Sequence, residues 1–121
     1  MSETGIPKRQ FDLEERTFQF ARAVKYFVKS LSRSLTHIEY GKQLVRSSGS
    51  VAANYIEASE ALSKKDFLMR IKICRKEAKE SILWLKLVDP TIDDERKKLV
   101  DEAGQLMKIF GAIIVKSENN H

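Results

Sequence analysis

The side chains that could support catalysis or metal binding are few and far apart in this sequence. Cys74 is the only cysteine, and histidine occurs only at His37 and His121. A catalytic thiol needs a nearby base and a metal site needs several ligands, and none of these residues has such neighbours in the sequence. His121 follows Glu118 at the spacing used in di-iron helical bundles, but a single copy lacks the carboxylates of the other helices.

We therefore expect a protein that is not an enzyme and has no metal and no cofactor. Cys74 is expected to be a buried thiol, since free cysteine is among the most buried residue types. His37 is expected to be a capping or surface residue rather than a ligand.

A group of polar residues does follow a helical spacing. Its four members are separated by four, four and three positions, which places them on one helix face: Arg46, Ser50, Asn54 and Glu57. Our first interpretation is a structural polar network, whose members satisfy one another or reach across to Arg70. The alternative is a contact with a ligand or RNA.

Positive charge is concentrated between Ser63 and Val88. Eight basic and three acidic residues give this segment +5, which equals the net charge of the whole chain. On a helix, six of the basic residues fall within about 100° of one another: Lys65, Lys72, Arg75, Lys76, Lys79 and Lys86. One hypothesis is an ordinary solvated face; the other is a track for phosphates or for an acidic partner. Because aromatic residues are absent from this row, binding of nucleic acid would be directed at the backbone and sensitive to salt.

The same segment has apolar residues outside its expected core row: Met69, Ile73, Leu83, Trp84 and Leu87. Additional apolar surface on a small bundle indicates an oligomer interface or a partner site. Trp84 is the natural anchor, since interface cores favour tryptophan. The alternative is that Trp84 closes one end of the monomer's own core; we favour self-association.

Four segments with helical periodicity position these groups. We expect helices over about 12–33, 37–62, 63–88 and 91–116, between a flexible segment 1–10 and a flexible tail 117–121. Thr36, Ser63 and Thr91 are candidate N-caps, and Asp89-Pro90 ends the third helix. Ser47 to Ser50 has poor helix propensity and allows a loop. We favour a continuous helix, because the heptad row of Gly41, Ser48, Tyr55 and Leu62 passes through it.

Each segment has an apolar row expected to face the core. The first row is Leu13, Phe20, Val24, Phe27 and Leu31, with Thr17 in the gap. The second is Ile38, Leu44, Val45, Val51, Ala52, Tyr55, Ile56 and Leu62. The third is Phe67, Ile71, Cys74, Ala78, Ser81, Leu85 and Val88, and the fourth is Ile92, Leu99, Ala103, Leu106, Phe110 and Ile113.

These rows predict an all-α fold, an up-down-up-down antiparallel four-helix bundle. A length of 121 residues fits one domain. With 42% apolar and 32% charged residues the composition is that of a globular protein. The N-terminus has no apolar signal region, and no apolar run is long enough to span a membrane. A cytoplasmic location is therefore expected.

Several motifs resemble those of a known family. Gln43–Glu57 is QLVRSSGSVAANYIE, and Ser63–Phe67 is SKKDF. The order Gln-Leu, Arg, Ser, Ala-Asn-x-x-Glu and Asp-Phe is similar to the pattern of the 23S rRNA intervening-sequence family, also called S23 ribosomal proteins. Phe11–Glu15 (FDLEE) and Lys76–Ser81 (KEAKES) are similar as well, so the resemblance extends over about residues 11–115. A common variant has glycine where this chain has Ala58.

The resemblance implies a bacterial four-helix bundle assembled as a barrel-shaped homopentamer with a basic surface. It also implies kinship with the accessory variability protein of diversity-generating retroelements, which works with a reverse transcriptase and RNA. Family members are often encoded within inserts in 23S rRNA genes, so the S23 label describes gene position.

Two functions remain after this comparison. The first is a non-catalytic oligomeric protein that binds nucleic acid, expected to be structured RNA, through the basic row. The second is an interaction adaptor whose basic face binds an acidic protein partner.

Overall fold

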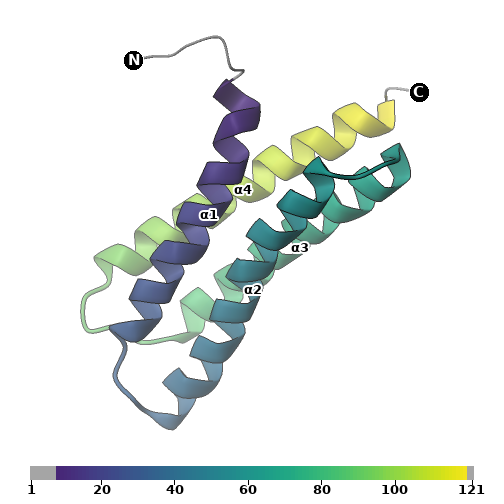
Figure 1. Cartoon of the computed structure of the whole chain (residues 1–121). Coiled ribbons are helices and arrows are strands. Elements are labelled where there is room, and N and C mark those ends of the chain that lie inside the picture. The colour runs from purple at the N-terminus through teal and green to yellow at the C-terminus, as the bar shows by residue number, and fades with distance from the viewer. Residues whose placement is uncertain (1–7, 120–121) are drawn as a thin grey trace.

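The computed structural model describes residues 8–119, and it contains four antiparallel α-helices (Figure 1). The helices are α1 (Lys8–Lys29), α2 (Leu35–Ser59), α3 (Lys64–Leu87) and α4 (Asp94–Asn119). The predicted up-down-up-down bundle is therefore confirmed. Of the ends expected to be flexible, residues 1–7 and 120–121 lie outside the described residues. Residues 8–10 and 117–119 were assigned wrongly, because they belong to α1 and α4.

The four helices do not pack equally closely. α2 and α3 share the most extensive contact, followed by α3 with α4 and α1 with α2, whereas α1 and α4 share the least. In Figure 1 the N-terminal half of α1 diverges from the C-terminal half of α4. Arg16 bridges these two helices, because its guanidinium donates to both carboxylate oxygens of Glu102 at 2.8 and 3.1 Å.

Most of the predicted core rows are buried. The whole first row lies in the core, Thr17 included, and so does the third row except for the half-buried Phe67. Gly41, Ser48 and Tyr55 are also buried along α2, which runs unbroken through residues 47–50. The continuous helix favoured for that segment is thus confirmed.

Parts of the second and fourth rows were assigned wrongly to the core. Ile38, Val45 and Ile56 lie on the solvent side of α2, because one helix can bury only the side that its neighbours cover. Leu62 is 98% exposed, since α2 has already ended at Ser59. In the fourth row, Ile92 precedes α4 and is exposed, and Ile114 is buried where the half-buried Ile113 was expected.

Two of the three predicted N-caps were also wrong. Ser63 does cap α3, and its hydroxyl accepts from the Asp66 N–H at 3.0 Å. α2 is instead capped by Ser34 rather than Thr36, through a bond from the His37 N–H at 3.1 Å. α4 begins at Asp94, three residues beyond Thr91.

α1 also ends earlier than expected, at Lys29, where the Ser30 hydroxyl donates to the Phe27 carbonyl.

His37 is buried, which differs from the expected capping or surface position. Its Nδ1 lies 3.0 Å from the Ser32 carbonyl oxygen, and its Nε2 accepts from the Asp89 N–H at 3.0 Å. This pattern requires the neutral ring with the proton on Nδ1. The ring thereby joins the α1–α2 and α3–α4 connections at one end of the bundle.

The buried thiol of Cys74 provides a test of this core. Burial raises the pKa of Cys74 to about 12, so the thiol stays protonated and unreactive at pH 8. We expect a colorimetric disulfide reagent to leave the native protein unmodified at pH 8 and to modify one thiol per chain in guanidinium chloride. Rapid modification of the native protein would show that the core around Cys74 opens readily.

Candidate functional site

The six predicted basic residues all lie on the exposed side of α3. Each is solvent-exposed, and their spacing places them along one surface of the helix. Because α3 is capped by Ser63 and buried along its opposite side, this row has a fixed backbone. The surface formed by these residues and the apolar residues between them is called the α3 outer surface below.

Basic and apolar residues are interleaved on the α3 outer surface. A shallow groove between α3 and the end of α4 is lined by apolar and charged side chains together: Lys64, Lys65, Asp66, Leu68, Met69, Lys72, Ile73, Lys76 and Glu118. Lys72 pairs with Glu118 across this groove at 3.1 Å. The groove therefore has an apolar floor and a rim that is mostly positive.

The predicted interface residues differ in how much of their surface is free. Met69, Leu83 and Leu87 are exposed, and Ile73 is half-buried. Trp84 is half-buried against the monomer's own core. Its ring stacks on Tyr40 of α2 at a centroid distance of 5.7 Å, and its N–H donates to Glu80 at 2.9 Å. Much of the Trp84 surface is thus already used within one chain.

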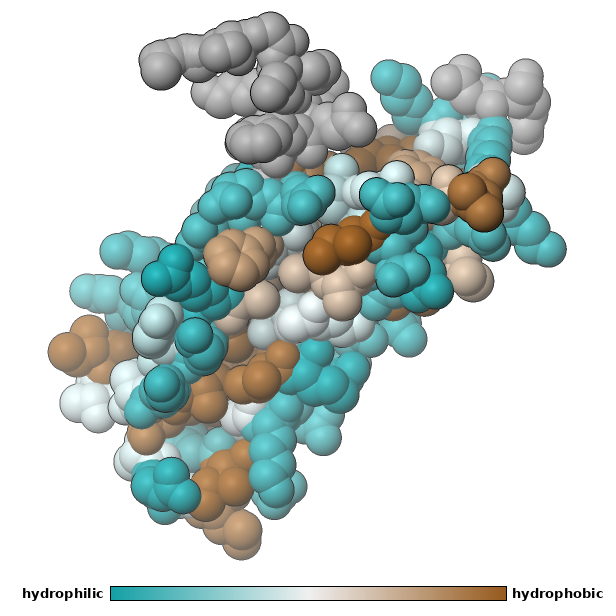
Figure 2. Space-filling view, in the orientation of Figure 1, coloured by the Kyte–Doolittle hydropathy of each residue, from teal (hydrophilic) through white to brown (hydrophobic). Residues whose placement is uncertain are grey.

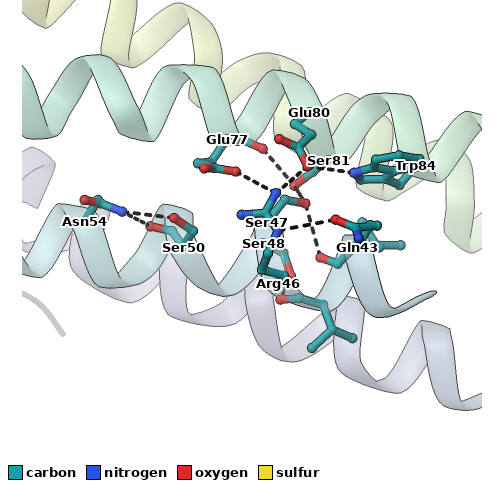
Figure 3. Close-up of polar contacts among 12 residues, drawn as sticks. Gln43, Arg46, Ser47, Ser48, Ser50, Asn54, Glu77, Glu80, Ser81 and Trp84 are labelled. Atoms are coloured by element: carbon teal, nitrogen blue, oxygen red, sulfur yellow. Dashed lines mark hydrogen bonds and ion pairs between the residues drawn. The ribbon is translucent and has the colours of Figure 1, made fainter. Parts of the chain in front are cut away.

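The polar residues of α2 separate into two groups (Figure 3). Arg46 reaches α3, where its guanidinium donates to Glu77 at 3.3 Å and forms an ion pair with Glu80. The N–H of Trp84 and the guanidinium of Arg46 lower the pKa of Glu80. Both carboxylates of this part of α3 therefore contact α2, and Glu80 also lies near Lys76, whose charge contributes to the lowered pKa of Glu80.

The second group lies nearer the C-terminus of α2. The Asn54 amide donates to the carbonyl and the hydroxyl of Ser50, at 2.9 and 3.0 Å. Arg70 of α3 donates to the Asn54 side-chain oxygen at 2.9 Å. The Glu57 side chain is exposed and makes no hydrogen bond or ion pair with the other described side chains. These contacts hold α2 against α3.

An apolar strip on α1 and α2 was not recognised in the sequence as surface. Val28, Ile38, Gly41 and Val45 line a groove between these helices, bordered by basic side chains. Figure 2 shows brown atoms in a line along this side of the molecule, with teal atoms beside them. The sequence signal for this strip is the spacing of Ile38, Val45 and Ile56 on α2.

The described residues contain no cluster of three or more potential metal ligands. Within the same range, no helix is long and apolar enough to cross a membrane. The residues that could do chemistry have structural contacts instead: both ring nitrogens of His37 are hydrogen-bonded, and the Cys74 thiol donates to the Val51 carbonyl at 3.5 Å.

The fold and the α3 outer surface define a small four-helix protein with a basic, partly apolar exterior. Residues 9–110 match the family described as 23S rRNA-intervening sequence protein, and the chain therefore belongs to that family. The resemblance seen in its motifs is confirmed.

A solved structure agrees with this assignment. The chain is similar to the crystal structure, at 1.70 Å resolution, of a protein of unknown function from the S23 ribosomal protein family of Bacteroides thetaiotaomicron VPI-5482. The TM-score is 0.77 and the sequence identity 27%, over 84% of this chain and 97% of the other. Among curated proteins, none matches this chain.

The Arg46 ion pairs give a testable prediction. Arg46→Ala leaves the carboxylate of Glu77, a residue that is only 7% exposed, without its cation. We expect the free energy of unfolding, measured in urea, to fall by about 1–3 kcal/mol. The same substitution in a Glu77→Gln, Glu80→Gln background should cost clearly less, because the partners are coupled.

The pH dependence has a defined sign. The pKa of Glu80 is lowered in the folded state. The contribution of the ionised Glu80 carboxylate to folding stability is therefore complete above the pKa of the unfolded chain, about 4.3, and is lost as the pH falls through the pKa of the folded state. The effect of Arg46→Ala should therefore shrink in acid. If Arg46→Ala lowers the free energy of unfolding equally in the wild type and in the Glu77→Gln, Glu80→Gln background, the ion pairs do not stabilise the bundle.

Proposed function

We propose that this protein is a non-catalytic, self-associating bundle that binds structured RNA through the α3 outer surface. The main supporting observation is the row of six exposed basic residues on one helix. Lysine and arginine held along a rigid element neutralise successive phosphates and release counterions. Such binding reads backbone charge and shape, which suits double-stranded RNA.

The orientation of the acidic residues supports this proposal. Of the three acidic residues of α3, Glu77 and Glu80 are turned toward Arg46 on α2. Only Asp66, near the N-terminus of α3, shares the groove with the lysines. Arg46 therefore offsets part of the negative charge that α3 itself carries beside the row.

Reversing three lysines together tests RNA binding. Lys72→Glu, Lys76→Glu and Lys79→Glu in one chain should weaken binding of a labelled transfer RNA at least tenfold at low salt. Because each phosphate contact contributes about 0.7–0.9 to the slope of log K against log salt, that slope should fall by about 2. Filter binding over a salt series measures both quantities.

The matched control reverses three exposed lysines of α4, Lys98, Lys108 and Lys116. It changes the net charge equally but leaves intact the six basic residues of α3, called the α3 row below. Equal loss in both variants would mean that only total charge matters. Wild-type affinity no greater than that of an unrelated protein of the same charge would refute RNA binding.

Self-association is proposed because apolar surface remains on the last two turns of α3. Leu83 and Leu87 are exposed there, whereas five of the six basic residues precede these two turns and only Lys86 lies among them. RNA and a neighbouring subunit would therefore use largely different parts of one helix. The family resemblance suggests a ring of five subunits.

Light scattering tests the assembly. We expect a mass near five times the 13.9 kDa of one chain, and Leu83→Glu with Leu87→Glu should reduce it, because charges are excluded from interface cores. Leu62→Glu is the control, since Leu62 is an exposed leucine in the α2–α3 connection. A monomer mass at micromolar concentration would contradict self-association. If Val45→Glu dissociates the assembly and the α3 substitutions do not, the subunit interface lies at the α1–α2 groove rather than on α3.

The groove beside the α3 row favours one alternative function. Its apolar floor and lysine rim suit an acidic amphipathic helix of another protein. Under this alternative the protein is an adaptor, and its partner would remain bound in a pull-down after nuclease treatment. Under the RNA proposal, captured material would be released by the nuclease.

A further inference from the structure

One exposed aromatic ring of α1 is surrounded by positive charge. Tyr26 is 52% exposed, and three cationic groups lie within 6 Å of its ring centroid. Lys25 Nζ is 4.7 Å away, and Arg22 Cζ and Lys29 Nζ are each 5.9 Å away. These four residues are called the Tyr26 cluster below.

The charges of the Tyr26 cluster are not used in ion pairs. Arg22, Lys25 and Lys29 form no salt bridge with any carboxylate of the described side chains, residues 13–119. Glu95 of α4 lines the shallow hollow beside the ring, but it is not bonded to these cations. The guanidinium of Arg22 and the ammonium of Lys25 lower the pKa of the Tyr26 hydroxyl. Three unneutralised cations near one exposed ring are a favourable setting for an anion that has a flat face.

We propose that the Tyr26 cluster binds an unpaired nucleotide, with the base stacked on the Tyr26 ring and the adjoining phosphates held by Arg22, Lys25 and Lys29. An aromatic platform combined with basic side chains is the general means by which proteins bind single-stranded nucleic acid. The lysine and arginine stems are long and flexible, so an incoming base displaces them from the ring toward the phosphates. This inference rests on the nucleic-acid function proposed above and adds a preference for single strands.

The Tyr26 cluster is separate from the α3 row. α1 packs against α2 and α4 and makes no such contact with α3 within residues 8–119, so the two basic regions lie on different sides of the bundle. The α3 row has lysines without exposed aromatic rings, whereas the Tyr26 cluster has both. The two regions are therefore expected to differ in their ligands, with base-paired RNA on α3 and an unpaired segment on α1.

The test compares two labelled probes, an oligoadenylate of about 15 nucleotides and an RNA duplex of similar length, by fluorescence anisotropy. Tyr26→Ala should weaken binding of the single strand about fivefold or more, which is the effect of losing one stacked base. Duplex binding should change less than twofold. Tyr26→Phe keeps the ring and should bind the single strand as the wild type does.

Phe18→Ala is the matched control, because Phe18 is 53% exposed on the same helix but is not surrounded by cations. Circular dichroism checks that each variant is folded, and Tyr26→Leu replaces Tyr26→Ala if alanine destabilises α1. Single-strand affinity unchanged in Tyr26→Leu, or lowered equally by Phe18→Ala, overturns the inference. If the wild type binds duplex while Tyr26 variants change nothing, only this inference fails. If the wild type binds neither probe, the proposed function fails with it.

Discussion

The packing of α2 against α3 depends on small side chains, and this α2–α3 interface determines which side chains of the two helices remain exposed. The Ser47 and Ser81 hydroxyls meet at 2.8 Å in the buried interface, and Ser81 also donates to the Glu77 carbonyl. Cys74 and Ala78 are completely buried on the same side of α3. Larger residues would push the helices apart, whereas paired hydroxyls allow close approach without leaving a buried polar group unsatisfied.

The α2–α3 interface also determines the directions of the charged side chains of α3. With α2 held close, Arg46 reaches Glu77 and Glu80, so the negative groups in the middle of α3 face a partner helix. The lysines on the other side remain in solvent. One helix thus has a neutralised inner edge and a basic outer surface. Both the RNA proposal and the adaptor alternative depend on this separation of charge.

The exposed apolar residues show that the monomer does not bury everything its sequence contains. Leu83 and Leu87 on α3 and Val45 and Ile56 on α2 lie outside a core that is already complete. Exposed apolar residues grouped on helix surfaces are usual where a partner covers them. This excess is the physical reason for proposing an assembly, and it occurs at two surfaces rather than the one identified from the third helix.

Much of the candidate site could be predicted from spacing within one helix. The six basic residues are exposed together because a helix repeats every 3.6 residues wherever it is placed. The same rule could have revealed the Tyr26 cluster, since Arg22, Lys25 and Lys29 are four and one residues before and three residues after Tyr26. The partners of Arg46 could not be found in this way, because Glu77 and Glu80 are 31 and 34 residues distant and the contact depends on how α2 is aligned with α3.

The sequence by itself determined the four helices, most of the core rows, the Ser63 cap and the family. These features follow from local periodicity and short motifs, which do not require knowledge of neighbouring helices. Only the tertiary structure decided which apolar residues of α2 stay outside, where Trp84 rests, and that His37 joins two connections. Those outcomes depend on which sides of each helix are covered by others, and side-chain packing between distant segments is the only thing that determines this.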